Sequence, residues 1–153
     1  MQKSFVTTEI GNYFFGIDLD LIREITRFIE ITPVSLAPDY ICGLMNLRGQ
    51  IVTVIDPGVH LNLGKRSSGS KSSCVILKSN IKNLTSSDVT GILVDNVGDI
   101  ISVDDDSIEP SPPNIGEVDG KYLNGVVKLN NKLLILLNMI SILNHQNMQE
   151  LSV

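Results

Sequence analysis

The sequence has few of the residues on which catalysis or covalent cross-linking depends. Its 153 residues include two cysteines, two histidines and no tryptophan, and only 19% are charged. Two thiols are too few for a disulfide framework and are typical of a reducing compartment. Acidic side chains outnumber basic ones, 17 to 12. This balance disfavours nucleic acid as a partner, because phosphates are bound by clustered Lys and Arg.

Long apolar runs are also missing. The richest, residues 133–143, has 11 residues and contains Asn138 and Ser141, whereas a helix that crosses a bilayer needs about 20. The first residues lack the apolar segment and cleavage site of a signal peptide. We therefore expect a cytoplasmic protein that does not insert into a membrane. A hydrophobic content of 42% excludes a disordered chain and is sufficient for a compact core.

Sequence patterns for catalysis or metal binding are absent. Neither histidine has a zinc-ligand spacing with Cys42 or Cys74, and no serine lies in a nucleophile elbow. The acidic residues 104–106 lack the Gly and Glu that complete an EF-hand loop. We therefore predict that the protein is not an enzyme and that it binds no metal and no cofactor.

The pattern of the chain is that of short β-strands. Runs rich in Val, Ile, Leu or Phe are separated by turn residues such as Gly11-Asn12 and Asn130-Asn131. The strands are predicted at residues 4–10, 13–17, 41–47, 51–55, 73–77, 89–94, 100–103, 123–129 and 133–137. Helical stretches are few and short, apart from an amphipathic tail at residues 139–151. The predicted fold class is all-β.

A repeated segment is the strongest internal signal. Residues 40–56 align without a gap with residues 122–138, and Gly16-Ile17 recurs upstream as Gly91-Ile92. Such an ordered set of matches indicates a duplication, and hence two similar β lobes in one domain. The expected lobes are residues 13–72 with the helix 139–151, and residues 1–12 with 73–138.

The two copies differ at the turn of their last hairpin. The first copy has Asn46, Arg48 and Gly49 there, whereas the second has different polar residues at 128–131. The shared fold does not require Asn-Leu-Arg-Gly, so these polar residues are candidates for binding a partner. The alternative is a plain hairpin turn with an exposed arginine.

The sequence resembles the CheW family of bacterial chemotaxis coupling proteins over about residues 3–143. The motifs that carry the resemblance are Gly16-Ile17-Asp18, Ile22-Arg23-Glu24-Ile25, Ile31-Thr32-Pro33-Val34, Ala37-Pro38-Asp39-Tyr40, Gly43 through Asp56, Gly91 through Val97, Pro112-Pro113 and Tyr122 through Val126. The resemblance implies two SH3-like five-stranded β-barrels with a hydrophobic groove between them, a few short helices and a C-terminal helix.

The resemblance also implies a function. Members of the family are adaptors without enzymatic activity, which link the cytoplasmic tip of methyl-accepting chemoreceptors to the regulatory domain of the histidine kinase CheA. The receptor tip is a coiled-coil hairpin, and the adaptor is recruited to membrane-associated receptor arrays. An adaptor of a different chemosensory pathway, such as pilus-based motility, is the alternative.

The motif positions carry over residue by residue. Members contact the receptor, or affect coupling, at the positions of Ile22 and Glu24. Their receptor-facing turn corresponds to the segment from Gly43 to Gly49, and a strand that lines their groove aligns with residues 73–75. The receptor- or kinase-binding residues predicted in this way are Ile22, Glu24, Gly43, Asn46, Arg48, Gly49, Cys74 and Val75.

The chain departs from the family pattern at two places. After Asp56 the family usually continues with an apolar residue and an arginine, whereas this chain has Pro57-Gly58. In the second copy, Asn138 replaces the usual aspartate. We therefore do not carry over the contact that the family's arginine makes, and we expect the helical turn after Asp56 to begin differently.

Overall fold

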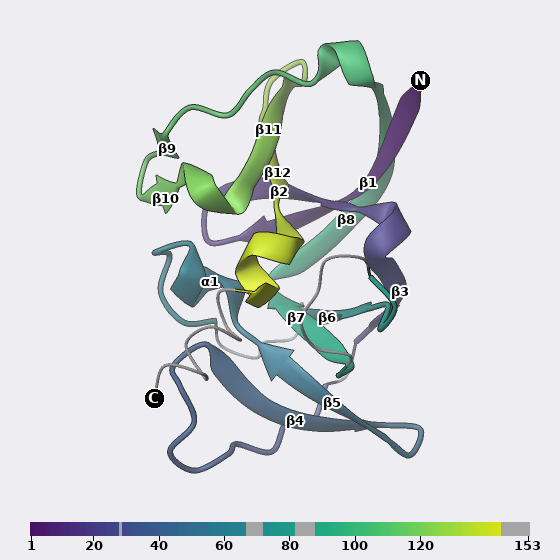
Figure 1. Cartoon of the computed structure of the whole chain (residues 1–153), viewed down its shortest axis with the longest axis vertical. Helices are drawn as coiled ribbons and strands as arrows, with labels where there is room; N and C mark the ends of the chain where they lie inside the picture. The colour runs from purple at the N-terminus through teal and green to yellow at the C-terminus, as the bar shows by residue number, and fades with distance from the viewer. Residues whose placement is uncertain (28, 67–71, 82–87, 145–153) are drawn as a thin grey trace.

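The computed structural model describes residues 1–27, 29–66, 72–81 and 88–144 (Figure 1). The strands are β1 (Gln2–Ile10), β2 (Tyr13–Asp18), β3 (Ile22–Thr26), β4 (Ile41–Leu47), β5 (Gln50–Ile55), β6 (Ser73–Leu77), β7 (Thr90–Val94), β8 (Asn96–Asp104), β9 (Asn114–Ile115), β10 (Val118–Asp119), β11 (Leu123–Lys128) and β12 (Leu133–Leu137). The helices are the short η1 (Leu19–Leu21), α1 (Pro57–His60), η2 (Asp105–Ser107) and η3 (Gly120–Tyr122), together with residues 139–144. The predicted all-β class is confirmed. The rest of the predicted tail helix lies outside the described residues.

Two five-stranded sheets, one above the other in Figure 1, make up most of the molecule, and β9 pairs with β10 in a separate two-stranded sheet. Sheet 1 has the order β11-β12-β2-β1-β8, and sheet 2, read from its β4 edge, has the order β4-β5-β7-β6-β3. Strands that correspond in the two repeats occupy corresponding places in the two orders. The duplication seen in the sequence is therefore a repeat of the strand order itself.

Each sheet combines strands from both repeats. The first repeat supplies β1 and β2 to sheet 1 but β3, β4 and β5 to sheet 2, and the second repeat does the reverse. Within the described residues the chain passes between the sheets at η1, after β2, and at Asp95, after β7. The two lobes are thus interlinked through an exchange of strand pairs.

This exchange corrects the lobe boundaries expected from the sequence. Residues 13–18 lie with β1 in sheet 1, and residues 73–94 supply two strands of sheet 2, each opposite to the expected lobe. The physical reason is local: the two-residue turn Gly11-Asn12 pairs Ile10 with Tyr13 in an antiparallel hairpin, and a two-residue connection keeps both strands in one sheet.

One buried cluster joins the two sheets. It contains Ile10 and Phe15 from sheet 1, Ile55 and Ile92 from sheet 2, and Met139 from the C-terminal helical residues, all at most 1% exposed. Burying a side chain of this size contributes about 1.5–3 kcal/mol. Each sheet also encloses a smaller apolar cluster of its own. The shared cluster fixes the lobes against each other.

Candidate functional site

The turn between β4 and β5 has an unusual backbone. Arg48 has φ of 50° and Gly49 has φ of 87°, so both central residues of this two-residue turn are left-handed, a conformation that favours Gly or Asn. The Gly49 N–H donates to Oδ1 of Asn46 at 2.8 Å. Asn46 therefore stabilises the turn, and Arg48 occupies a position that most side chains avoid.

The Arg48 side chain reaches across to β3, which is the edge strand of sheet 2 opposite to β4. Its Nη2 lies 2.6 Å from Oε2 of Glu24. Arg23, the neighbour of Glu24, donates from Nη1 to Oε1 of Gln50 at 2.8 Å, and its Nε lies 3.3 Å from the same Glu24 oxygen. We call Arg23, Glu24, Arg48 and Gln50 the tip cluster. It joins the end of the hairpin to the edge of the sheet.

The tip cluster combines predicted and unpredicted residues. Glu24 and Arg48 were predicted independently from separate motifs, and the structure brings them together. Arg23 and Gln50 were not predicted, although each is the sequence neighbour of a predicted residue or turn. The sequence offers no signal for this pairing, because β3 and β5 are not neighbours in sheet 2 and only the fold brings their side chains together.

The ion pair changes the acidity of Glu24. The hydrogen bond from Arg48 is the largest influence and lowers the pKa of the Glu24 carboxyl below its ordinary value, with smaller contributions from the charges of Arg48 and Arg23. A carboxyl whose pKa is lowered on folding stabilises the fold above its unfolded pKa. That contribution is lost as the pH falls through the folded value. The tip cluster is therefore expected to loosen in acid.

We predict that Arg48→Met raises the titration midpoint of Glu24. With the largest cause of the lowered pKa removed, the midpoint should move up toward the ordinary value for glutamate. The measurement is a carbon-detected NMR titration of the Glu24 carboxyl in both proteins. Lys65→Met, which removes another exposed cation that pairs with Asp39, is the control and should leave the midpoint unchanged. An unchanged midpoint in Arg48→Met would contradict the pairing.

Exposed apolar side chains accompany the tip cluster on the same sheet. Ile51 is 58% exposed and lies directly opposite Asn46, which is also exposed. Ile25 on β3 and Leu44 on β4 are 39% and 37% exposed. These strands therefore present apolar surface together with a fixed ion pair, a combination found in protein-binding surfaces.

Two other predicted residues lie inside the molecule. Cys74 and Val75 belong to β6 and have no exposed surface, so they do not line an open groove, and the prediction for them disagrees with the structure. Burial raises the pKa of the Cys74 thiol to about 12, which leaves it an unreactive apolar group. The reason is that β6 lies between β3 and β7 within sheet 2, with both of its faces covered.

Gly43 has a structural task that its repeat partner shares. Its φ is 149°, and a Cβ there would overlap the carbonyl oxygen of Thr32, which accepts from the N–H of Leu44 at 2.9 Å. In the second repeat Gly125, with φ of 144°, lies in the same way against the carbonyl of Glu109. Gly43 is buried and allows close approach of two backbone segments.

Ile22, another predicted binding residue, is half-buried and packs against the shared cluster.

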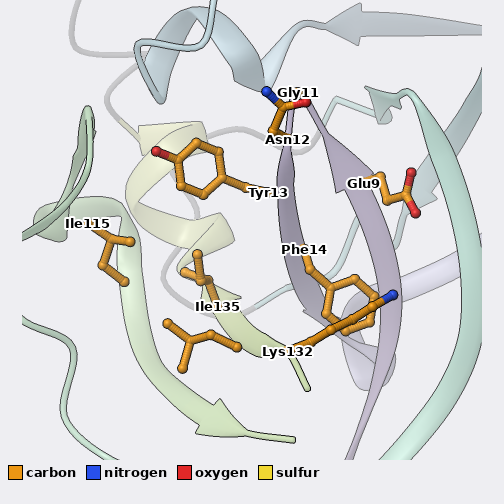
Figure 2. A pocket seen from close by; sticks show the side chains of 9 residues that line it. Glu9, Gly11, Asn12, Tyr13, Phe14, Ile115, Lys132 and Ile135 are labelled. Carbon is orange, nitrogen blue, oxygen red and sulfur yellow. The ribbon is translucent and has the colours of Figure 1, made fainter. Parts of the chain in front are cut away.

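A cavity of about 560 Å³ opens elsewhere, on sheet 1. It is lined by Glu9, Gly11, Asn12, Tyr13, Phe14, Ile115, Lys132, Leu133 and Ile135 (Figure 2). Nζ of Lys132 lies 4.9 Å from the centre of the Phe14 ring. The Tyr13 hydroxyl donates to Glu117, and this bond raises the pKa of the tyrosine. A proton-bearing tyrosine and a lysine over a ring do not form a nucleophile and base pair.

Possible metal ligands were compared over the part of the chain that the structure describes. There, no three His, Cys, Asp or Glu side chains are grouped so that they could hold an ion.

Among the described residues, no helix has the length and apolar character needed to span a membrane.

Two five-stranded sheets that exchange strand pairs, with a charged hairpin tip beside exposed apolar residues, have the features of a protein-binding module. The family model for the CheW-like domain matches residues 4–147, and the chain belongs to this family.

Named relatives agree with this assignment. The chemotaxis protein CheW of Klebsiella aerogenes is 30% identical over 146 residues, which cover 95% of this chain and 84% of that protein. The chemotaxis protein CheW of Treponema pallidum is 28% identical over 155 residues, covering 99% and 88%. The crystal structure of the scaffolding protein TtCheW from Thermoanaerobacter tengcongensis superimposes with a TM-score of 0.76 at 30% identity, over 90% of this chain and 84% of that one.

Proposed function

We propose that this protein is a non-enzymatic chemotaxis adaptor of the cytoplasm, which couples the cytoplasmic tip of methyl-accepting chemoreceptors to the regulatory domain of the kinase CheA. The observation that carries the proposal is the tip cluster with its neighbouring apolar residues. Family membership supports the chemotaxis setting, and the tip cluster supplies a surface on which a partner can be held in a defined orientation.

Arg48 is suited to bind a partner while it remains paired with Glu24. A guanidinium has five N–H donors in a fixed plane, and the described contacts of Arg48 use Nη2 toward Glu24. The side chain is 67% exposed, so its other donors face solvent. They can bind a carboxylate or a carbonyl group of a partner by directed hydrogen bonds.

The exposed apolar residues suit the apolar side chains of a receptor tip. A coiled-coil hairpin presents apolar side chains at helical spacing, and an amphipathic helix binds by placing that face against apolar surface. Ile51, Ile25 and Leu44 supply such surface on the strands that carry the tip cluster. The charged pair would then set the orientation of the helix, and the apolar residues would provide most of the affinity.

An adaptor of this kind acts by setting the relative position of its two partners. It holds receptor and kinase in fixed relation, and it can transmit a signal only if its contacts differ between the two signalling states of the receptor. The interlinked sheets suit this task, since a shared buried cluster resists relative movement of the lobes.

The test is the affinity of Ile51→Ser for a receptor-tip fragment and for the kinase regulatory domain, measured by calorimetry. We expect at least a tenfold loss for one of the two partners, because Ile51 is the most exposed apolar residue beside the tip cluster. Leu36→Ser is the matched control: Leu36 is fully exposed on a different segment and should be neutral. Equal affinity of Ile51→Ser and wild type for both partners would contradict the proposal.

A further inference from the structure

A buried arginine lies in the segment that connects the two repeats. The Arg66 side chain is 9% exposed. Its Nη1 donates to a carboxylate oxygen of Asp95, and its Nη2 donates to the carbonyl oxygen of Leu63 at 2.8 Å. Its Nε lies 3.9 Å from Oδ1 of Asp56, whose other oxygen accepts from the backbone N–H of Arg66. One cation thus faces two carboxylates.

These two carboxylates belong to different parts of the fold. Asp56 follows β5 in sheet 2, is 3% exposed, and accepts from the N–H of Gly58 at 2.9 Å at the start of α1. Asp95 lies between β7 and β8, where the chain passes from sheet 2 to sheet 1. Arg66 therefore connects the end of a sheet 2 strand to a crossing between the sheets.

Asp95 extends this connection to the β1–β2 turn. Its Oδ2 accepts from the N–H of Gly11 at 2.8 Å, and its own N–H donates to the carbonyl of Glu9 at 2.9 Å. Oδ2 is also the oxygen that Arg66 binds. The position of the carboxylate that holds the Gly11 amide is therefore set in part by Arg66.

The absence of a side chain at residue 58 makes room for this arrangement. A Cβ on Gly58 would lie 2.9 Å from Nε of Arg66 and would also overlap the carbonyl of Gly64. The second repeat has Asn138 and Ile140 at the positions equivalent to Asp56 and Gly58, so it has neither the acid nor the space. The departure from the family pattern at Pro57-Gly58 thus coincides with an arginine supplied from residue 66.

We propose that Arg66 is a positioning residue: it clamps the connection between the repeats onto the crossing at Asp95 and thereby holds the β1–β2 turn in place. This inference goes beyond the adaptor function and depends on no partner. Residues 63–66 are then part of the fixed framework, held through the contacts of Arg66 with Leu63, Asp56 and Asp95. The Arg66 side chain is buried and that of Asp95 is 34% exposed, so removing Asp95 takes a partner from a buried cation, and removing Arg66 takes the shared cation from both carboxylates; single substitutions should therefore be costly.

The test is a double-mutant cycle of Arg66→Met and Asp95→Asn. Each single variant should lower the melting temperature by roughly 5 °C or more. The double variant should lose little more than the worse single variant, because both substitutions remove the same interaction. Lys65→Met is the matched control, since the adjacent Lys65 is 66% exposed and pairs with an exposed Asp39, and it should change the melting temperature little.

A local readout separates positioning from general stability. In Arg66→Met, hydrogen exchange of the Gly11 amide should become at least tenfold faster than in Lys65→Met, under conditions in which both proteins are folded. Arg66→Lys, which keeps the charge but not the planar donors, should restore part of the protection. Additive losses in the cycle, or Gly11 exchange that is equal in Arg66→Met and Lys65→Met, would overturn the proposal. Neither measurement involves receptor or kinase, so failure here is distinguishable from failure of the adaptor function.

Discussion

Arg48→Glu is expected to weaken binding of the receptor tip or of the kinase regulatory domain by at least tenfold, with an almost unchanged melting temperature. The substitution replaces solvent-exposed donors with a carboxylate, which also repels the nearby Glu24. Because Arg48 is 67% exposed, water screens this repulsion and the fold tolerates it. Circular dichroism and thermal unfolding check the fold, and calorimetry with each partner measures the affinity.

A charge-reversed pair separates the two roles of Arg48. In the double variant Glu24→Arg with Arg48→Glu, an ion pair of opposite sense can form again between β3 and the turn. If Arg48 acts only by joining the hairpin to β3, the double variant should bind like the wild type. We expect that binding stays weak, because the partner meets a reversed charge at residue 48. Full recovery of affinity in the double variant would remove Arg48 from the binding surface.

Gly43→Ala is expected to destabilise the fold by about 3 kcal/mol, because the added Cβ overlaps the Thr32 carbonyl and the backbone conformation is strained for any residue with a side chain. Gly125→Ala in the second repeat should cost a similar amount, since its φ and its contact with Glu109 match. The measurement is urea unfolding of both variants.

Gly49→Ala supplies the control for backbone strain alone. Gly49 also has a positive φ, 87°, but a Cβ there meets nothing within 4 Å, so we expect a loss of only about 1 kcal/mol. If Gly43→Ala lost no more stability than Gly49→Ala, then the close approach of the Thr32 carbonyl would not be the reason for a glycine at residue 43. Partner affinity per folded molecule should be normal in Gly43→Ala, in contrast to Arg48→Glu.

The sequence predicts most of the strands and the duplication because both depend on local pattern, but it misses β3 and the short β9 and β10. Alternating apolar residues and two-residue turns define β1, β2, β4 and β5 with little reference to the rest of the chain. The choice of sheet is different, since an apolar strand face is satisfied equally well in either lobe. Residues 13–18 and 73–94 were therefore assigned to the wrong lobe, although the crossings at η1 and Asp95 decide the matter in the structure.

The candidate site was predictable only where it depends on local sequence. The unusual composition of the turn from Asn46 to Gly49 is visible in the sequence, because the second repeat lacks it. The burial of Cys74 and Val75 also had a signal: a run without polar alternation is typical of a strand covered on both faces. The pairing of Glu24 with Arg48 and the clamp at Arg66 depend on segments that only the folded chain brings together.

Bridging of two partners is the property that most directly tests the central claim. A receptor-tip fragment is immobilised and the kinase regulatory domain is added. The amount of kinase domain that is retained is then measured as this protein is titrated in. We expect retention to rise with the wild type, to fall again at a large excess as the two partners become separately saturated, and to be lost or strongly reduced with Arg48→Glu. Retention that does not depend on the wild-type protein, or equal bridging by wild type and Arg48→Glu, would contradict an adaptor that works through the tip cluster.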